Sequence, residues 1–188
     1  PKDASQKLFD AMAQSKHVAH QLHLPVQSGN SRVLKEMNRG YTREQYLEKV
    51  GYAKSVMPDL VLTSDIIIGF PGETEAEAMD TVSLIREVRY DALFTFIYSP
   101  RKGTPAAEMD TQIPDKVKSE RFDRLLKCQN EISLEMNKPM VNKTVRVLCD
   151  GRSKNDPSVF SGRTEGNKIV FFDGEDENTG EFLDILIE

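Results

Sequence analysis

One stretch of the chain, Leu60 to Thr74, limits the possible folds more than any other. It begins with a nearly unbroken run of apolar, largely β-branched residues, the pattern of a parallel strand covered on both faces in an α/β protein. Glycine and proline residues at 69–72 then turn the chain, and Thr74 with Glu77 matches the capping box that opens a helix. A strand, a glycine-rich turn and a helix in this order predict a ligand site beyond the carboxyl end of the strand.

The N-terminal part of the chain alternates helices with strands. We expect helices near residues 3–15, 32–38, 42–57, 75–89 and 114–137, strands at 21–26, 60–68 and 92–98, and a long loop at 99–113. Such alternation implies a parallel sheet with right-handed crossovers. A closed barrel of this kind takes about eight strands, so three strands predict an α/β half-barrel.

Local signals place the ends and faces of the helices. Thr42 and Gln45 form a second capping box. Gly40 suits the left-handed position at the end of the short helix before it. The buried stripe of the helix at 75–89 is expected to be Met79, Val82, Ile85 and Val88.

The pattern changes near residue 138. Short alternating segments, separated by glycine and asparagine, are expected to be strands at 143–149, 160–164, 168–172 and 182–187, with Gly151 in a loop. Several short strands in about 50 residues predict a small antiparallel β-barrel. The sequence therefore predicts two domains, residues 1–137 and residues 138–188.

The composition, 38% apolar and 29% charged residues, is ordinary for a globular chain, and no apolar run is long enough to span a membrane. Residues 1–5 do not form a signal peptide, and the missing initiator methionine favours a fragment. Cys128 and Cys149 are too far apart for a local metal motif, which favours free thiols in a cytoplasmic protein.

Charge is unevenly distributed along the chain. The net charge is −5, which argues against a general nucleic-acid binder. Residues 138–168, however, carry seven Lys/Arg against three Asp/Glu, a net charge of +4, whereas residues 169–188 carry seven acids and no Lys or Arg. The basic segment is either a phosphate-binding surface or an ordinary solvated hairpin.

Three polar residues could converge at one mouth of a parallel barrel. Gln27 is expected to end the first strand, Arg39 follows the short helix, and Asp65 lies inside the apolar run, where a carboxylate is costly unless something binds it. An amide and a carboxylate suit the vicinal hydroxyls of a ribose, and an arginine suits a free carboxylate. The turn at 71–74 could bind phosphate, but a plain capped turn is the simpler interpretation, and Glu73 argues against an anion.

Five runs of residues resemble the radical S-adenosylmethionine (SAM) methylthiotransferases. They are HLPVQSG at 23–29, MNRGYTR at 37–43, DIIIGFPGET at 65–74, FTFIYSPRKGTP at 94–105 and SGRTEGNKIV at 161–170. The resemblance is strongest to the MiaB-type branch, which adds a methylthio group to C2 of N6-isopentenyladenosine 37 in the anticodon loop of tRNA. The last run resembles the RNA-binding TRAM module of that branch.

The resemblance implies a fold and a set of residue roles. The chain would be the second half of a radical SAM barrel, of the TIM type, followed by an OB-like TRAM barrel. Residues that would bind the S-adenosylmethionine cofactor are Gln27, Ser28, Arg39, Asp65, Gly69 and Tyr98. Residues that would contact tRNA are Arg163, Asn167 and Lys168, which flank or form a Gly166-Asn167 turn and would be presented together at one hairpin tip.

The sequence departs from the family in its cysteines. The family uses two 4Fe-4S clusters, one held by a Cys-x3-Cys-x2-Cys loop, and neither cysteine set is present. We therefore expect the parent protein to be a tRNA methylthiotransferase, and this chain to bind no cluster and to be inactive alone. The alternatives are the ribosomal-protein methylthiotransferase branch and a non-catalytic RNA-binding fragment. With the first barrel strands missing, the strand at 21–26 should lie at an unpaired edge, which invites self-association.

Overall fold

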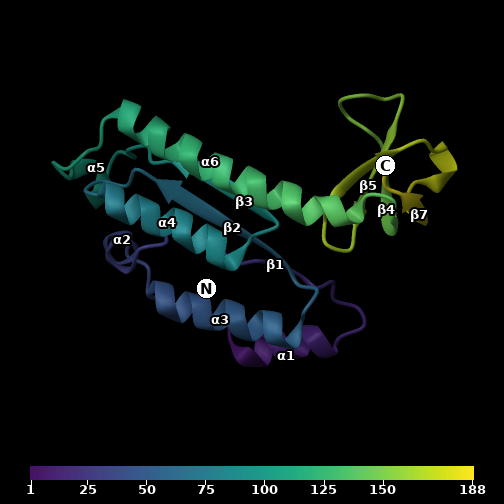
Figure 1. Cartoon of the computed structure of the whole chain (residues 1–188), viewed down its shortest axis with the longest axis horizontal. Helices are drawn as coiled ribbons and strands as arrows, with labels where there is room; N and C mark the ends of the chain where they lie inside the picture. Colours follow the sequence, from purple (N-terminus) through teal and green to yellow (C-terminus); the bar gives the residue numbers. More distant parts are fainter.

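The computed structural model describes residues 1–188 and contains two sheets joined by one long helix (Figure 1). The first sheet is parallel, in the order β1-β2-β3, and consists of β1 (Gln21–His23), β2 (Val61–Ile68) and β3 (Ala92–Ile97). Strand β1 pairs only with β2, which confirms the predicted edge strand. It is shorter than expected, because Pro25 offers no backbone N–H and Gln27 has a left-handed φ of 74°. Gln27 rejoins the sheet through an isolated bridge to Ile66.

Six α-helices accompany this sheet. They are α1 (Gln6–Gln14), α2 (Ser31–Glu36), α3 (Arg43–Val56), α4 (Glu75–Val88), α5 (Pro105–Glu108) and α6 (Asp115–Asn137). Both predicted capping boxes are present, at the starts of α3 and α4. The prediction for Gly40 was wrong, because the left-handed residue after α2 is Asn38, with φ 56°. Met79 is also exposed rather than buried, and the inner face of α4 is completed by Ala78, Thr81 and Leu84.

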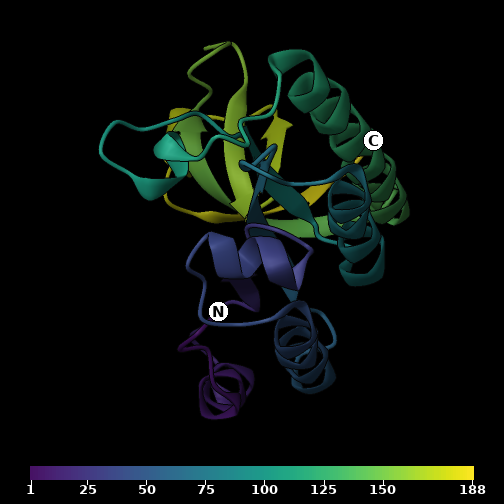
Figure 2. The same ribbon diagram turned by 90° about the vertical axis from the view of Figure 1, so that its left-hand side faces the viewer.

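Only one face of the parallel sheet is covered. Residues of β2 alternate strictly, and Leu62, Ser64, Ile66 and Ile68 point into the core beneath α3, α4 and α6. Figure 2 shows these helices wrapping one side of the strands. The opposite face is open, with Phe94 and Phe96 of β3 more than half exposed. The expectation that both faces of β2 are covered was therefore wrong: the open face is the one that a complete barrel would turn inward.

The second sheet is antiparallel, in the order β6-β5-β4-β7. Its strands are β4 (Thr144–Arg152), β5 (Phe160–Thr164), β6 (Ile169–Phe172) and β7 (Phe182–Leu186), and short 3-10 turns lie at Lys138–Met140 and Asp176–Asn178. Strand β4 continues through Gly151, which was expected in a loop, because a bulge between Cys149 and Gly151 absorbs the irregularity. The small core consists of Val147, Cys149, Phe160, Val170 and Phe172.

The antiparallel sheet lies beyond the N-terminal end of the parallel strands. Strand β2 points towards α2 and α5, whereas the antiparallel sheet lies beyond the other end of β2 (Figure 1). Helix α6 bridges them with 23 residues, a length of about 35 Å. None of the helices combines the length and the hydrophobicity that a membrane-spanning helix requires.

Candidate functional site

The carboxyl end of the parallel sheet brings several predicted site residues together. The Gln27 N–H donates to the Asp65 carbonyl at 2.8 Å, and the Ile67 N–H donates back to the Gln27 carbonyl at 2.9 Å. Tyr98, just after β3, donates its N–H to the Ile68 carbonyl at 2.9 Å. Gly69 follows Ile68 directly. These main-chain bonds hold residues from three loops at one edge, where α/β proteins bind ligands.

Ser28 is fully buried beside Gln27. Its hydroxyl accepts a hydrogen bond from the Asn30 N–H at 3.3 Å. Asn30 in turn caps helix α2 by accepting from the Arg32 and Val33 N–H groups. The side chain of Ser28 therefore holds the loop in shape, which fixes the position of Gln27.

Asp65 lies on the open face of the sheet rather than in the core. Its side chain is 28% exposed, and its Oδ1 lies 3.4 Å from Nε2 of His23. The other ring nitrogen of His23 lies 2.9 Å from the Thr63 hydroxyl, and the ring packs edge-on against Phe94 with centroids 5.7 Å apart. The expected burial of Asp65 was wrong, because its side chain points to the face of β2 that no helix covers. His23 could not be recognised as part of this site from the sequence, because a single histidine two residues before Pro25 and four before Gln27 forms no distinctive pattern.

Arg39 is not joined to the other predicted cofactor residues. Its side chain is exposed after helix α2 and makes no hydrogen bond or ion pair. The positive charge of Arg39 acts instead on the amino group of Pro1. The pKa of that amino group is lowered, mainly by burial and to a smaller extent by the charges of Lys49 and Arg39. The structure therefore joins Gln27 to Asp65 through the main chain, whereas Arg39 forms no bond to either residue.

The glycine turn after β2 is closed by an internal carboxylate. Gly69 has φ 77°, and its N–H donates to Oε2 of the buried Glu73 at 2.9 Å. Arg121 of α6 donates to the same oxygen at 3.0 Å and to the Glu73 carbonyl at 2.9 Å. Burial raises the pKa of Glu73, against the opposing effects of the Gly69 N–H and the Arg121 charge. This Glu73–Arg121 pair was missed at the sequence level, because its members are 48 residues apart.

The N-terminus of α4 is likewise occupied by the chain itself. Glu77 accepts from the Thr74 N–H at 2.8 Å and from Nη2 of Arg32 at 2.7 Å. The hydrogen bond from Arg32 is the main reason that the pKa of Glu77 falls to about 2. The Glu77 carboxylate already accepts the Thr74 N–H, and the buried Glu73 carboxylate accepts the Gly69 N–H. These contacts describe a capped turn rather than a phosphate site.

Two observations test whether the residues present suit the family's cofactors. The Tyr98 hydroxyl is buried without a hydrogen-bond partner, while its ring packs edge-on against Phe70 at 5.4 Å. An unpaired hydroxyl beside the Gln27 and Asp65 edge suits a polar ligand such as a nucleoside. No group of His, Cys, Asp or Glu residues suits a metal ion, and Cys128 and Cys149 are buried in separate cores. The chain's own residues therefore fit S-adenosylmethionine in part and do not fit an iron–sulfur cluster.

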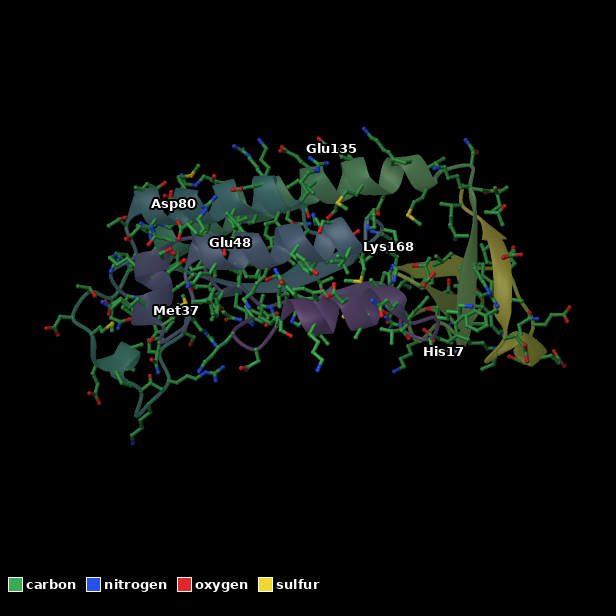
Figure 3. The ribbon with its side chains drawn as sticks, turned by 90° about the horizontal axis from the view of Figure 1, so that it is seen from below. His17, Met37, Glu48, Asp80, Glu135 and Lys168 are labelled. Carbon is green, nitrogen blue, oxygen red and sulfur yellow. The ribbon has the colours of Figure 1, made fainter.

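The basic hairpin between β5 and β6 is arranged differently from the expectation. Arg163 remains on the surface, where it donates to Asp150 at 3.1 Å and to the Asn167 side chain at 2.9 Å. Lys168 turns to the parallel-sheet part of the chain and lies 3.2 Å from Asp91 (Figure 3). The two charges are thus not presented together at the tip. Asn167 forms the turn itself, with φ 61°.

Comparisons with known proteins agree with this two-part structure. Residues 3–85 match the Radical SAM superfamily model, and residues 138–188 match the TRAM domain model. A protein from Alkaliphilus oremlandii named tRNA-2-methylthio-N(6)-dimethylallyladenosine synthase is 50% identical over 187 residues, covering 100% of this chain and 40% of the relative. Relatives of the same name from Clostridium botulinum and Acetivibrio thermocellus are both 48% identical over the whole chain, with 42% and 39% of their own lengths covered.

The chain belongs to the radical SAM methylthiotransferase family. The chain spans about 40% of the length of the curated relatives that it matches. A solved radical SAM structure, coproporphyrinogen III oxidase from Escherichia coli, superposes with a TM-score of 0.60 at 12% identity, covering 91% of this chain and 49% of the other. At that identity the likeness concerns the fold alone, and it supports the assignment of the parallel sheet to a partial radical SAM barrel.

Proposed function

We propose that this chain is the cofactor-edge and RNA-holding part of a cytoplasmic tRNA methylthiotransferase. The reaction would place a methylthio group on C2 of N6-isopentenyladenosine 37 in the tRNA anticodon loop, by radical SAM chemistry. One observation carries the proposal: identity of 48–50% along essentially the whole chain to relatives whose names state that product. We also propose a domain boundary between residues 137 and 138, supported by the end of α6 and the start of the TRAM match.

The residues at the carboxyl edge have separate proposed tasks. Asp65 and the Gln27 amide would bind the ribose hydroxyls, and the backbone at Gly69 and around Tyr98 would contact the adenine side. Arg39, whose side chain is exposed, would bind the cofactor carboxylate. S-adenosylmethionine, with the family's clusters, would supply the radical. These 188 residues contribute no cluster ligand set, so the chain alone is proposed to be inactive.

The TRAM sheet is the proposed tRNA-holding part. Arg163 and Asn167 lie at its hairpin surface, where they suit phosphate contacts that carry little sequence information. Helix α6 separates this sheet from the cofactor edge by its 23 residues, about 35 Å. At that distance the sheet would grip tRNA outside the anticodon loop. A short anticodon stem-loop should then depend less on the TRAM sheet than whole tRNA does.

The activity is tested with the full-length protein, purified without oxygen. The substrate is tRNA that carries the isopentenyl group, taken from a strain that does not add the methylthio group. We expect the protein to convert it, and nucleoside mass spectrometry detects the product, 2-methylthio-N6-isopentenyladenosine. A tRNA that lacks the isopentenyl group is the matched control and should remain unchanged. Modification of a ribosomal-protein peptide instead of tRNA would contradict the proposal, as would tRNA binding with no S-adenosylmethionine consumed.

Asp65→Asn in the full-length protein is expected to weaken S-adenosylmethionine binding. Loss of a charge-assisted hydrogen bond costs about 1.5–3 kcal/mol, or about ten- to a hundredfold in affinity. Titration calorimetry measures the affinity, and the melting temperature should change little because the side chain lies on the open face. Glu48→Gln, on the exposed outer surface of α3, is the control. Unchanged affinity in the Asp65 variant would remove this residue from the cofactor site.

A further inference from the structure

Asp91, immediately before β3, has a nearly buried carboxylate. Its side chain is 8% exposed. One oxygen, Oδ2, accepts a hydrogen bond from the Leu62 N–H at 3.0 Å, and the Asp91 N–H donates to the Leu62 carbonyl at 2.9 Å. The residue therefore ties the beginnings of β2 and β3 together. Its other oxygen, Oδ1, is left facing the antiparallel sheet, and a buried carboxylate in this position needs a positive partner.

That partner comes from the antiparallel sheet. The ammonium group of Lys168 lies 3.2 Å from Asp91 Oδ1 and also donates to the Asn137 side chain, at the end of α6, at 3.0 Å. The Lys168 side chain is 25% exposed, against 46% for Arg163 on the same hairpin. One ammonium group thus connects the β5–β6 hairpin, the parallel sheet and the connecting helix.

The hairpin tip also packs against the parallel sheet without polar contacts. A Cβ atom added at Gly166 would lie 2.5 Å from Cγ2 of Val61, the first residue of β2. The backbone of Gly166 does not have a positive φ, so the glycine is needed here for close approach rather than for its conformation. The steric fit at Gly166 and the ion pair at Lys168 are independent contacts at the same junction.

We propose that the β5–β6 hairpin is the dock that fixes the TRAM sheet to the base of the radical SAM half-barrel, and that Lys168 is its positioning residue. Its positive charge neutralises Asp91 and is not available to an RNA phosphate. Phosphate binding on this hairpin then falls to Arg163, whose pair with Asp150 is nearly half exposed and open to solvent. The docking contact stands without the proposed enzymatic function, and only its use in holding tRNA at a fixed place rests on that function.

The dock is tested in the full-length protein with Lys168→Met and Gly166→Ala. The linker between the two sheets is residues 138–143, between α6 and β4. Without the dock this linker should open about tenfold more often, because Lys168→Met removes a charged contact. Opening is read from the rate of trypsin cleavage after Lys143, because Lys138 is followed by Pro139 and resists trypsin. Hydrogen exchange of the peptide at the start of β2 provides a second measurement. Gly51→Ala, with no atom within 4 Å of the new Cβ, is the control for adding a methyl group.

The Asp91→Asn, Lys168→Met double variant tests whether the two residues act as a pair. If they do, it should open no faster than the worse of the two single variants. If the effects of Asp91→Asn and Lys168→Met on the opening rate add up in the double variant, the dock is overturned. It is also overturned if neither Lys168→Met nor Gly166→Ala changes the cleavage and exchange rates. These readouts involve no tRNA, so their failure is distinct from failure of the proposed function.

RNA binding separates docking from direct contact. Across a salt series, filter binding of whole tRNA should lose about one counterion in its salt dependence with Arg163→Ala, and none with Lys168→Met. A reduced slope in Lys168→Met, equal to that of Arg163→Ala, would show that Lys168 contacts phosphate and would overturn its positioning role.

Discussion

Arg121→Met is expected to lower the free energy of unfolding by about 3–5 kcal/mol, because it leaves the buried Glu73 without a counter-charge. Both side chains of this pair are buried, and they meet at 3.0 Å. No other group can replace Arg121 as a partner of Glu73, because the second carboxylate oxygen, Oε1, is already buried without a hydrogen-bond partner. Losing Arg121 also removes the bond to the Glu73 carbonyl, which releases the turn that carries Gly69. Urea unfolding followed by circular dichroism measures the loss.

The control for this prediction lies one helical turn further along α6. Arg124 pairs with Glu75, and both side chains are about half exposed. Arg124→Met should therefore cost about 1 kcal/mol or less. Equal losses in the two variants would show that the burial of the Glu73–Arg121 pair does not matter.

The loss of unfolding free energy in Arg121→Met should also depend on pH. Burial already raises the pKa of Glu73 above its ordinary value of 4.5, and removing Arg121 raises it further. For an acid whose folded pKa is raised, stability is fully present below the unfolded pKa and is lost as the pH rises through the folded pKa. The deficit of the variant is therefore expected to be larger at pH 7 than at pH 4. A deficit that grows on acidification would contradict this account.

Gly29→Ala is expected to destabilise the protein by about 3 kcal/mol, because overpacking against the main chain cannot relax by a side-chain rotation. The new Cβ would lie 2.4 Å from Cα of Thr81 and 2.7 Å from the Asp80 carbonyl oxygen. The loop would have to withdraw from α4, which would break the hydrogen bond from the Gly29 N–H to the Thr81 hydroxyl at 2.9 Å. Because Gln27 and Ser28 precede this glycine, their loop would move as well.

The same substitution elsewhere should have the opposite sign. Gly51 lies on the exposed face of α3, and nothing lies within 4 Å of an added Cβ. Gly51→Ala is therefore expected to stabilise the protein by about 0.5–1 kcal/mol through helix propensity. Thermal unfolding of both variants compares them directly. If Gly29→Ala unfolds at the temperature of the unmodified protein, the close packing of this loop against α4 is not as the structure describes.

Features set by short-range chemistry were predictable from the sequence. The capping boxes at Thr42 and Thr74 are present because a hydroxyl three residues before a Glu or Gln closes the same hydrogen bonds in most contexts. The parallel order of β1, β2 and β3 follows from the alternation with helices, and the turn at Gly69 follows from its composition. The placement of Gln27 and Asp65 at one edge follows from that topology.

Features set by distant partners were not predictable. An apolar run such as that of β2 occurs both in strands covered on one face and in strands covered on both faces. The open face of the sheet, which exposes Phe94, therefore could not be recognised from the sequence. The orientation of Lys168 depends on Asp91, which precedes it by 77 positions in the sequence. No local pattern in a basic hairpin indicates whether a lysine faces solvent or a buried carboxylate. Pairing of this kind needs the fold before it can be seen.

Each of the two hydrophobic cores holds a single buried cysteine. Cys128 lies in the core under the parallel sheet, and Cys149 lies in the core of the antiparallel sheet. A buried thiol is shielded from alkylating reagents until the structure around it opens. Peptide-resolved alkylation rates would therefore time the opening of each half of the molecule separately, with both reporters already in the natural sequence and no label introduced.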